Sequence, residues 1–164
     1  MTDFVRAESG IRQLHARCID AVWRKDAKAF ADCFAEDGEW KIAGLHMHGR
    51  AEIEAAIGKF LGLSERVFIQ NGDTILEVDG ATAIGRTYVL EHSKRADGQG
   101  FTTIGIYYER FAEEEGAWKF RWRHWSLQYR GPADLSERFY DSHDYGPPPG
   151  MPGQDEPTTI KRPE

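Results

Sequence analysis

The second half of the chain consists of four strand-like segments separated by turn signals, and this arrangement constrains the fold more than any other feature. The predicted strands cover residues 66–78, 81–92, 101–111 and 118–129, the first of them interrupted at Asn71-Gly72. Asp79-Gly80 is a strong hairpin signal, and turns at 96–100 and 113–116 separate the later segments. Four consecutive strands joined in this way predict an antiparallel meander.

The first half has helical periodicity. Residues on one stripe recur at steps of three and four, namely Ile11, Leu14, His15, Cys18, Ile19 and Val22. Asp26 is placed to cap a second, shorter helix that carries Phe30 and Phe34, and Gly49-Arg50 begins a third. A short strand over 39–42 and a turn or second short strand over 44–49 lie between them. Helices followed by strands predict an α+β fold, with the helices packed on one face of a curved antiparallel sheet.

Size and charge narrow the classes of function. The chain has 164 residues and a formal net charge of −6, so we expect one domain and no nucleic-acid partner. No apolar run approaches the length of a membrane span, and the N-terminus lacks the basic and apolar regions of a secretory signal. We therefore expect a cytoplasmic protein with no membrane partner. Its two cysteines, Cys18 and Cys33, are expected to be buried and reduced.

The composition changes from about Gly131. Residues 146–153, with the sequence GPPPGMPG, cannot join the interior of a helix or sheet. We expect a domain over 1–130 and a C-terminal tail or arm over 131–164. The segment is either disordered or an extended arm that lies on the domain or on a partner subunit, with Phe139, Tyr140 and Tyr145 as apolar anchors.

The segment Trp118–Ser126 contains a row of aromatic residues. Its even positions are Trp, Phe, Trp, His and Ser, and its odd positions are Lys, Arg, Arg and Trp. Because side chains alternate across a strand, this predicts one aromatic face that ends in the imidazole of His124 and the hydroxyl of Ser126. Such a face indicates a pocket lined by rings with a few polar groups.

Several segments together resemble the SnoaL-like branch of the nuclear transport factor 2-like superfamily. They are the paired first helices with Asp26 between them, FAEDGEW at 34–40, GRAEI at 49–53, VDGATA at 78–83 and GAWKF at 116–120. Their order and spacing match over about residues 8–130. The family includes scytalone dehydratase, a hexachlorocyclohexane dehydrochlorinase, steroid isomerases, polyketide cyclases, formaldehyde-releasing lyases of lignin-derived aromatic dimers, and members of no known activity.

The resemblance implies a cone-shaped curved sheet wrapped around the helices, with a deep pocket open at one end. Dehydratase-like members use an Asp late in the first helix and a His on the first long strand. Those positions fall on Trp23 and Ile69, which cannot move a proton, and a cationic position on the last strand falls on His124. The resemblance also implies chemistry without a cofactor and a homodimer or homotrimer.

Four residues are candidates for proton transfer. His124 is the first, as a general acid or base on the aromatic face. Tyr107 is the second, since the alternation with Thr103 points it inward, where its phenol can bond a substrate oxygen. Glu91 is a candidate base if the family register, which points Thr87, Val89 and Glu91 inward, holds. His15 lies on the apolar stripe of the first helix. The alternative for each is a structural residue, in the core or, for Glu91, at an exposed strand end.

Six further residues are candidates for binding a substrate. Trp23, Trp40 and Trp122 are expected to line the cavity and to favour flat, ring-bearing ligands, unless they fill the cone completely. Asn71 and Thr103 are expected to face inward, although Asn71 precedes Gly72 and is equally typical of a bulge. A one-residue shift of the 81–92 strand would bring Arg86 and Tyr88 into the pocket instead. His46 is expected near the pocket mouth.

We expect neither a metal nor a cofactor. His46 and His48 form a His-x-His pair that is typical of metal ligands, but no carboxylate or cysteine accompanies them at ligand spacing. No glycine-rich loop of a phosphate-binding kind occurs.

The sequence favours a cofactor-independent lyase that removes a proton from a small hydrophobic molecule, with aromatic molecules as the favoured class, and expels water or formaldehyde. Hydrolysis is disfavoured because neither cysteine has a setting that would activate it. The alternatives are a non-catalytic binding protein for an apolar metabolite, an isomerase or cyclase of the same fold, and an oligomer-forming domain with a filled core.

Overall fold

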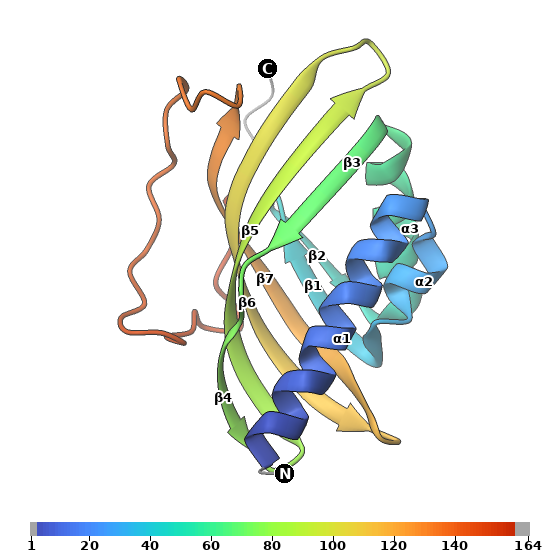
Figure 1. Ribbon diagram of the computed structural model, residues 1–164, viewed down its shortest axis with the longest axis vertical. Helices are drawn as coiled ribbons and strands as arrows, with labels where there is room; N and C mark the ends of the chain where they lie inside the picture. Colours follow the sequence, from blue (N-terminus) through green and yellow to red (C-terminus); the bar gives the residue numbers. More distant parts are fainter. Residues whose placement is uncertain (1–2, 160–164) are drawn as a thin grey trace.

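The computed structural model describes residues 3–159, which form three helices and one seven-stranded sheet (Figure 1). The helices are α1 (Asp3–Arg24), α2 (Ala27–Ala31) and α3 (Gly49–Gly62). The strands are β1 (Phe34–Ile42), β2 (Leu45–His48), β3 (Ser64–Asn71), β4 (Ile75–Asp79), β5 (Thr82–Arg95), β6 (Gly100–Glu114) and β7 (Ala117–Gly131). The predicted α+β class is confirmed.

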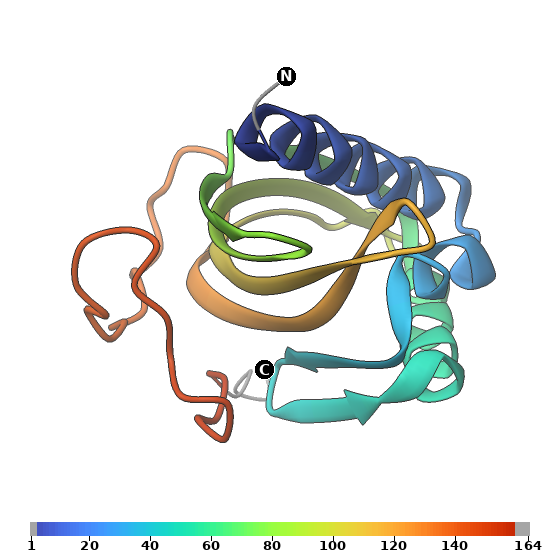
Figure 2. The same ribbon diagram turned by 90° about the horizontal axis from the view of Figure 1, so that it is seen from below.

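The sheet is curved, and its strand order is β2-β1-β7-β6-β5-β3, with β4 paired to β5 beyond the end of β3. Every pair is antiparallel except β1 with β7. Figure 2 shows the strands coiling around the interior, with α1 across one side and α3 beside β1 and β2. Among residues 3–159 no helix combines the length and the apolar character needed to cross a membrane.

The helices form where the periodicity predicts them. On α1, Ile11, Leu14 and Cys18 are almost completely buried, so the apolar stripe faces the sheet. Asp26 caps α2, and its Oδ1 accepts a hydrogen bond from the Ala29 N–H at 2.9 Å. Phe34 does not belong to this helix as predicted. It begins β1, because its backbone pairs with β7 in the parallel ladder.

β7 contains an irregularity at Arg121 that decides which side chains face the helices. In the β6–β7 ladder Phe111 pairs with Phe120, but the next residue towards the N-terminus of β6, Arg110, pairs with Trp122. Arg121 is therefore the extra residue of a β-bulge. A single inserted residue reverses the face of the side chains that follow it, here as far as the second irregularity of β7, at Gln128.

The bulge overturns the prediction of one continuous aromatic face. Phe120, before the bulge, packs in the main core, and Trp125 and Leu127 do so after it. Trp122 packs instead in a separate cluster on the outer side of the sheet, and His124 stacks on it with ring centroids 5.4 Å apart. The expectation that Trp122 and His124 face the interior with Phe120 is wrong, because period-two alternation does not survive a bulge.

Residues 132–159 run as an extended arm along the outer side of the sheet (Figure 1). Tyr145 packs edge-on against Tyr108, with centroids 5.1 Å apart, and Met151 joins the same cluster. Lys41 donates through Nζ to the carbonyl oxygens of Gln154 and Glu156 at 2.8 and 2.6 Å. For residues 132–159, the structure therefore agrees with an extended arm on the domain and not with a disordered tail.

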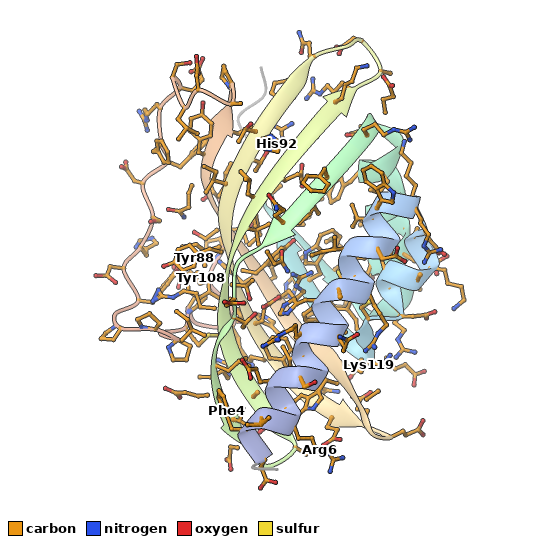
Figure 3. The ribbon with its side chains drawn as sticks, in the orientation of Figure 1. Phe4, Arg6, Tyr88, His92, Tyr108 and Lys119 are labelled. Carbon is orange, nitrogen blue, oxygen red and sulfur yellow. The ribbon has the colours of Figure 1, made fainter. Side chains whose placement is uncertain are left out.

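The side chains of Tyr88 and Tyr108 project from the sheet on the side of this arm (Figure 3). Tyr108 is buried beneath the arm, whereas Tyr88 remains 48% exposed. On the opposite face, Val89 belongs to the main core and Thr87 is fully buried. The register that points Thr87 and Val89 inward is therefore confirmed, and the alternative that would bring Arg86 and Tyr88 into the interior is wrong.

His124 lies in this covered region and is 2% exposed. Burial disfavours the charged imidazolium, and the nearby charge of Lys41 acts in the same direction, so the pKa of His124 is lowered to about 4.

We expect an NMR pH titration of the His124 ring to have its midpoint near pH 4. The unfolded chain binds this proton near pH 6.5 and the folded chain does not, so the free energy of unfolding decreases as the pH falls from about 6.5 to about 4. His124→Gln lessens that acid-dependent loss, whereas His143→Gln, at a side chain that is 82% exposed, leaves it unchanged. A midpoint near 6.5 in the folded protein would contradict the buried setting.

Candidate active site

A fully buried carboxylate, Glu109 on β6, is the centre of the polar interior. His15 Nε2 lies 3.1 Å from its Oε1 and 3.0 Å from its Oε2. Arg123 Nε donates to Oε1 at 2.8 Å, and Thr87 Oγ1 donates to Oε2 at 2.7 Å. All three partners are buried as well. One carboxylate thus joins side chains from α1, β5 and β7.

The sheet register and the bulge bring these groups together. Glu109 pairs directly with Arg123 in the β6–β7 ladder, and the bulge at Arg121 is what turns Arg123 to the inner face. His15 comes from the buried stripe of α1. Its ring packs against Phe111 and Phe120, with centroids 5.8 and 5.3 Å away, so the orientation of the imidazole is restricted.

The electrostatics of the cluster favour an ionised Glu109. Burial alone raises the pKa of a carboxyl group, but the electrostatic interactions with His15 and Arg123 and the hydrogen bonds from His15 and Thr87 outweigh it and hold the pKa of Glu109 below its usual value. Burial likewise disfavours the charged guanidinium of Arg123, and Glu109 more than offsets this, so the pKa of Arg123 is raised. The pair is therefore ionised in the interior.

Arg123 also contacts two aromatic rings and a thiol. Its guanidinium carbon lies 3.7 Å from the ring centroid of Tyr107 and 4.2 Å from that of Phe120. Its Nη1 donates to Cys18 Sγ at 3.6 Å. Cys18 and Cys33 are both buried free thiols. Burial raises the pKa of Tyr107 to about 12, so its phenol stays protonated beside the cation.

A cavity of about 210 Å³ lies beside this cluster, between α1 and the connection from β3 to β4. It is lined by Glu8, Ile11, Arg12, His15, Ala16, Ile19, Asn71, Gly72, Asp73, Thr74 and Leu76. Two lining residues lead directly to Glu109. His15 bonds it, and Thr74 Oγ1 lies 2.9 Å from Thr87 Oγ1, which bonds it in turn.

This geometry equips His15 for proton transfer. When Nε2 carries the proton and donates it to Glu109, Nδ1 is left with a lone pair. Among the described residues Nδ1 has no hydrogen-bond partner, and His15 is one of the residues that line the cavity. A carboxylate that bonds one nitrogen of an imidazole fixes its tautomer and stabilises the imidazolium that forms when the other nitrogen takes a proton.

Comparison with protein families gives a match to the SnoaL-like domain over residues 3–124. The chain belongs to the SnoaL-like domain family. A search of curated proteins found no match.

Solved structures show the same fold. Rv3472 of Mycobacterium tuberculosis, a protein of unknown function, is 26% identical with a TM-score of 0.68, over 83% of this chain and 77% of that one. A protein of Novosphingobium aromaticivorans assigned as a scytalone dehydratase is 17% identical with a TM-score of 0.76, over the whole of both chains. The hexachlorocyclohexane dehydrochlorinase LinA-type3 of Novosphingobium barchaimii is 17% identical with a TM-score of 0.72, over 86% and 98%.

The SnoaL-like resemblance places the family's acid–base positions at Trp23 and Ile69, and the cavity lies further along the same two elements. Asn71 follows Ile69 by two residues on β3, and His15 precedes Trp23 by eight on α1. His15 and Asn71, predicted separately as site residues, line this one cavity. The structure therefore brings these two candidates together.

Tyr107 and Trp40 face the interior as predicted, and they contact one another. Trp40 Nε1 donates to Tyr107 Oη at 3.1 Å. Phe30 and Phe60 pack on the Trp40 ring, with centroids 5.1 and 5.8 Å away. The part of the cone around Trp40 is thus occupied by side chains that satisfy each other.

Glu91 and Thr103 are register partners further along β5 and β6. Burial raises the pKa of Glu91, against the opposing charge of Arg130. Thr103 is 6% exposed, and its Oγ1 is a buried atom with no hydrogen-bond partner among the described residues. Neither residue lines the cavity beside His15.

Four predicted site residues lie elsewhere than expected. Trp122 and His124 are on the outer face under the arm because of the bulge. Trp23 is 57% exposed near the end of α1, since the buried stripe of α1 runs through Ala21 and Val22 instead. Its ring meets that of Phe68 in an edge-on contact. His46 projects from the hairpin face opposite the buried Met47, so it does not face the pocket.

No carboxylate accompanies His46 and His48 at ligand spacing along the chain, but strand pairing brings one beside them. Glu39 on β1 pairs with His48 in the β1–β2 ladder, and its Oε2 lies 2.6 Å from His46 Nε2. The hairpin brings together residues that no spacing rule for consecutive ligands connects.

The residues that sequence reasoning missed are Glu109, Arg123 and Thr74. A signal for Glu109 exists, because it shares the parity of Tyr107 on an unbroken stretch of β6, and an acidic residue at an inward position is rare. No such signal exists for Arg123, since its inward direction depends on the bulge.

We expect Glu109→Gln to lower the free energy of unfolding by roughly 3–5 kcal/mol, because it leaves the guanidinium of Arg123 buried without a counter-charge. Denaturant-induced unfolding measures the change. Glu113 lies on the same strand as Glu109 and forms a surface ion pair with Arg6 of α1. Glu113→Gln should lower the free energy of unfolding by less than about 1 kcal/mol. Equal losses in the free energy of unfolding would show that the buried pair stabilises the fold no more than a surface pair does.

Proposed function

We propose that this chain is a cofactor-independent lyase that removes a proton from a small hydrophobic molecule and expels a leaving group such as water or formaldehyde. The observation that carries the proposal is a histidine held by a buried carboxylate at the wall of a cavity. In this proposal His15 is the general base and Glu109 is the residue that orients it.

The proposed proton transfer runs through Nδ1 of His15. For loss of water, Nδ1 takes a proton from a carbon of the bound molecule, the electron pair of that C–H bond forms the new double bond, and the hydroxyl on the adjacent carbon departs with its bonding electrons and receives the proton from the imidazolium. For loss of formaldehyde, Nδ1 takes the O–H proton of a hydroxymethyl group, that electron pair forms the C=O bond, and the C–C bonding pair stays on the remaining carbon, which receives the proton from the imidazolium. The imidazolium that results is stabilised by Glu109, which accepts its Nε2–H. Arg123 keeps Glu109 ionised through the cycle.

The cavity favours a molecule of about one ring. An engineered cavity of about 150 Å³ in another protein holds benzene, so about 210 Å³ accommodates a six-membered ring with small substituents. Ile11, Ile19 and Leu76 supply apolar wall. The polar lining comes from Asn71 and Thr74 and from the charged residues Glu8, Arg12 and Asp73, and we assign to Asn71 a hydrogen bond to a substrate oxygen.

The similar structures support a lyase because proteins with this fold include such enzymes. They include a protein assigned as a scytalone dehydratase and dehydrochlorinases, which eliminate a small molecule from their substrates. With Trp23 and Ile69 at the usual acid–base positions, His15 and Glu109 are the carboxylate–histidine pair that this chain offers in their place.

A binding protein for an apolar metabolite is the second candidate. The specific observation in its favour is that Trp23 and Ile69 cannot carry a proton, while Trp40 and Tyr107 satisfy each other's polar atoms. The same cavity then holds a ligand without turnover. A homodimer or homotrimer and a cytoplasmic location stay predictions for both candidates.

We expect turnover of at least one member of a panel of aromatic alcohols and diols, and a loss of about 10²–10⁴-fold in kcat on His15→Gln. The matched control is His143→Gln, which removes an exposed imidazole from the arm.

The outcomes separate the candidates. Unchanged kcat in His15→Gln would exclude His15 as the base. Melting-temperature shifts with aromatic ligands that Asn71→Leu abolishes, without turnover of any member, would select the binding protein.

A further inference from the structure

The hairpin formed by β1 and β2 carries two imidazoles and a carboxylate on one face. Glu39 pairs with His48 across the ladder, and His46 lies two residues before His48 on β2. Their ligating atoms all lie within 4.8 Å of one another. His46 Nε2 is 2.6 Å from Glu39 Oε2, and His48 Nδ1 is 3.9 Å from the same oxygen.

The alternation of the strands fixes this face. Trp40 and Met47, the neighbours of the cluster on each strand, are 2% and 7% exposed and point into the core. Their burial makes the opposite direction of Glu39, His46 and His48 a consequence of the pleat. A register slip that removed the cluster would also expose Trp40, so the cluster is held in place by the core.

The hairpin is also held at its ends. Its two-residue turn has positive φ at Ala43 and Gly44, 52° and 78°, which matches the right-handed twist of the strands. Gly44 N–H donates to Thr158 Oγ1 of the arm at 2.7 Å. At the other end, the carboxylate of Glu52 accepts the backbone N–H of His48 at 2.8 Å. The three side chains therefore stand on a fixed backbone.

We propose that Glu39, His46 and His48 bind a divalent transition-metal ion, with Zn²⁺ the best fit to the donor set. Two imidazole nitrogens and one carboxylate oxygen are a ligand set that zinc takes in proteins, with further positions filled by water. The side chains of Glu39, His46 and His48 are 35%, 34% and 62% exposed, so water reaches the remaining positions.

The distances suit an ion of this size. Ligand atoms at about 2.0–2.1 Å from a tetrahedral ion lie roughly 3.3 Å from each other. The contact of His46 with Glu39 is shorter than this and that of His48 is longer, so small side-chain rotations bring all three to the ion. The two rings already lie side by side, with centroids 3.9 Å apart.

This site is separate from the proposed lyase chemistry. None of its residues lines the cavity beside His15. The ion would tie β1 to β2 at the place where β1 joins the parallel ladder with β7. It is thus a clamp on the hairpin with positions open to exchangeable ligands, and its occupancy can be tested whatever the outcome for His15.

The test is isothermal titration of chelator-treated, full-length protein with Zn²⁺ at neutral pH. We expect one ion per chain. The dissociation constant should be at least ten times larger for each of Glu39→Gln, His46→Gln and His48→Gln. His143→Gln is the matched control, since it removes an exposed histidine outside the cluster and should leave binding unchanged. Circular dichroism confirms that each variant is folded.

NMR identifies the site independently, because Zn²⁺ should shift the ring resonances of His46 and His48 and leave those of His92 in place. The proposal is overturned if the wild-type protein binds no Zn²⁺, or if His46→Gln and Glu39→Gln bind it as tightly as the wild type.

Discussion

The ion pair of Glu109 with Arg123 is the interaction on which the interior depends. A buried charge without a partner is strongly unfavourable, so each of the two charges stabilises the other. The pair joins the two longest strands directly, and His15 ties α1 to the same carboxylate. A cluster of this kind stabilises one docking angle of α1 on the sheet, since a shift by one turn would leave Glu109 without the imidazole.

The bulge at Arg121 is the feature that makes this pair possible. Without it, Arg123 would share the outer face with Arg121, and Trp122 and His124 would lie inside. With it, the interior receives a guanidinium, and the arm receives an aromatic platform on which Tyr145 packs. One extra residue thus turns Arg123 to the inner face and Trp122 to the outer face. It thereby creates both the polar interior and the aromatic surface on which the arm packs.

The sequence predicted the elements well because they depend on local signals. Apolar periodicity in α1, the cap at Asp26 and the glycine-containing turns each act within a few residues, and the structure has them where they were expected. The site was predicted only in part. His15, Asn71 and Tyr107 follow from parity and periodicity on unbroken elements. The prediction put His124 and Trp122 on the inner face because no residue in 118–126 indicates a bulge.

The same limit explains why the Glu39 cluster escaped prediction, since strand pairing joins residues without a fixed spacing.

The position of His15 suggests how a family can change its chemistry and keep its fold. A carboxylate and an imidazole need only a shared hydrogen bond and a common cavity, and the order of the two along the chain is immaterial. In dehydratase-like members of the SnoaL-like family the resemblance puts the acid on the first helix and the histidine on a strand. Here the histidine is on α1 and the acid on β6. In the proposed mechanism Arg123 compensates the charge of Glu109 and α1 supplies the base through His15, so the exposed Trp23 is not needed as a proton carrier.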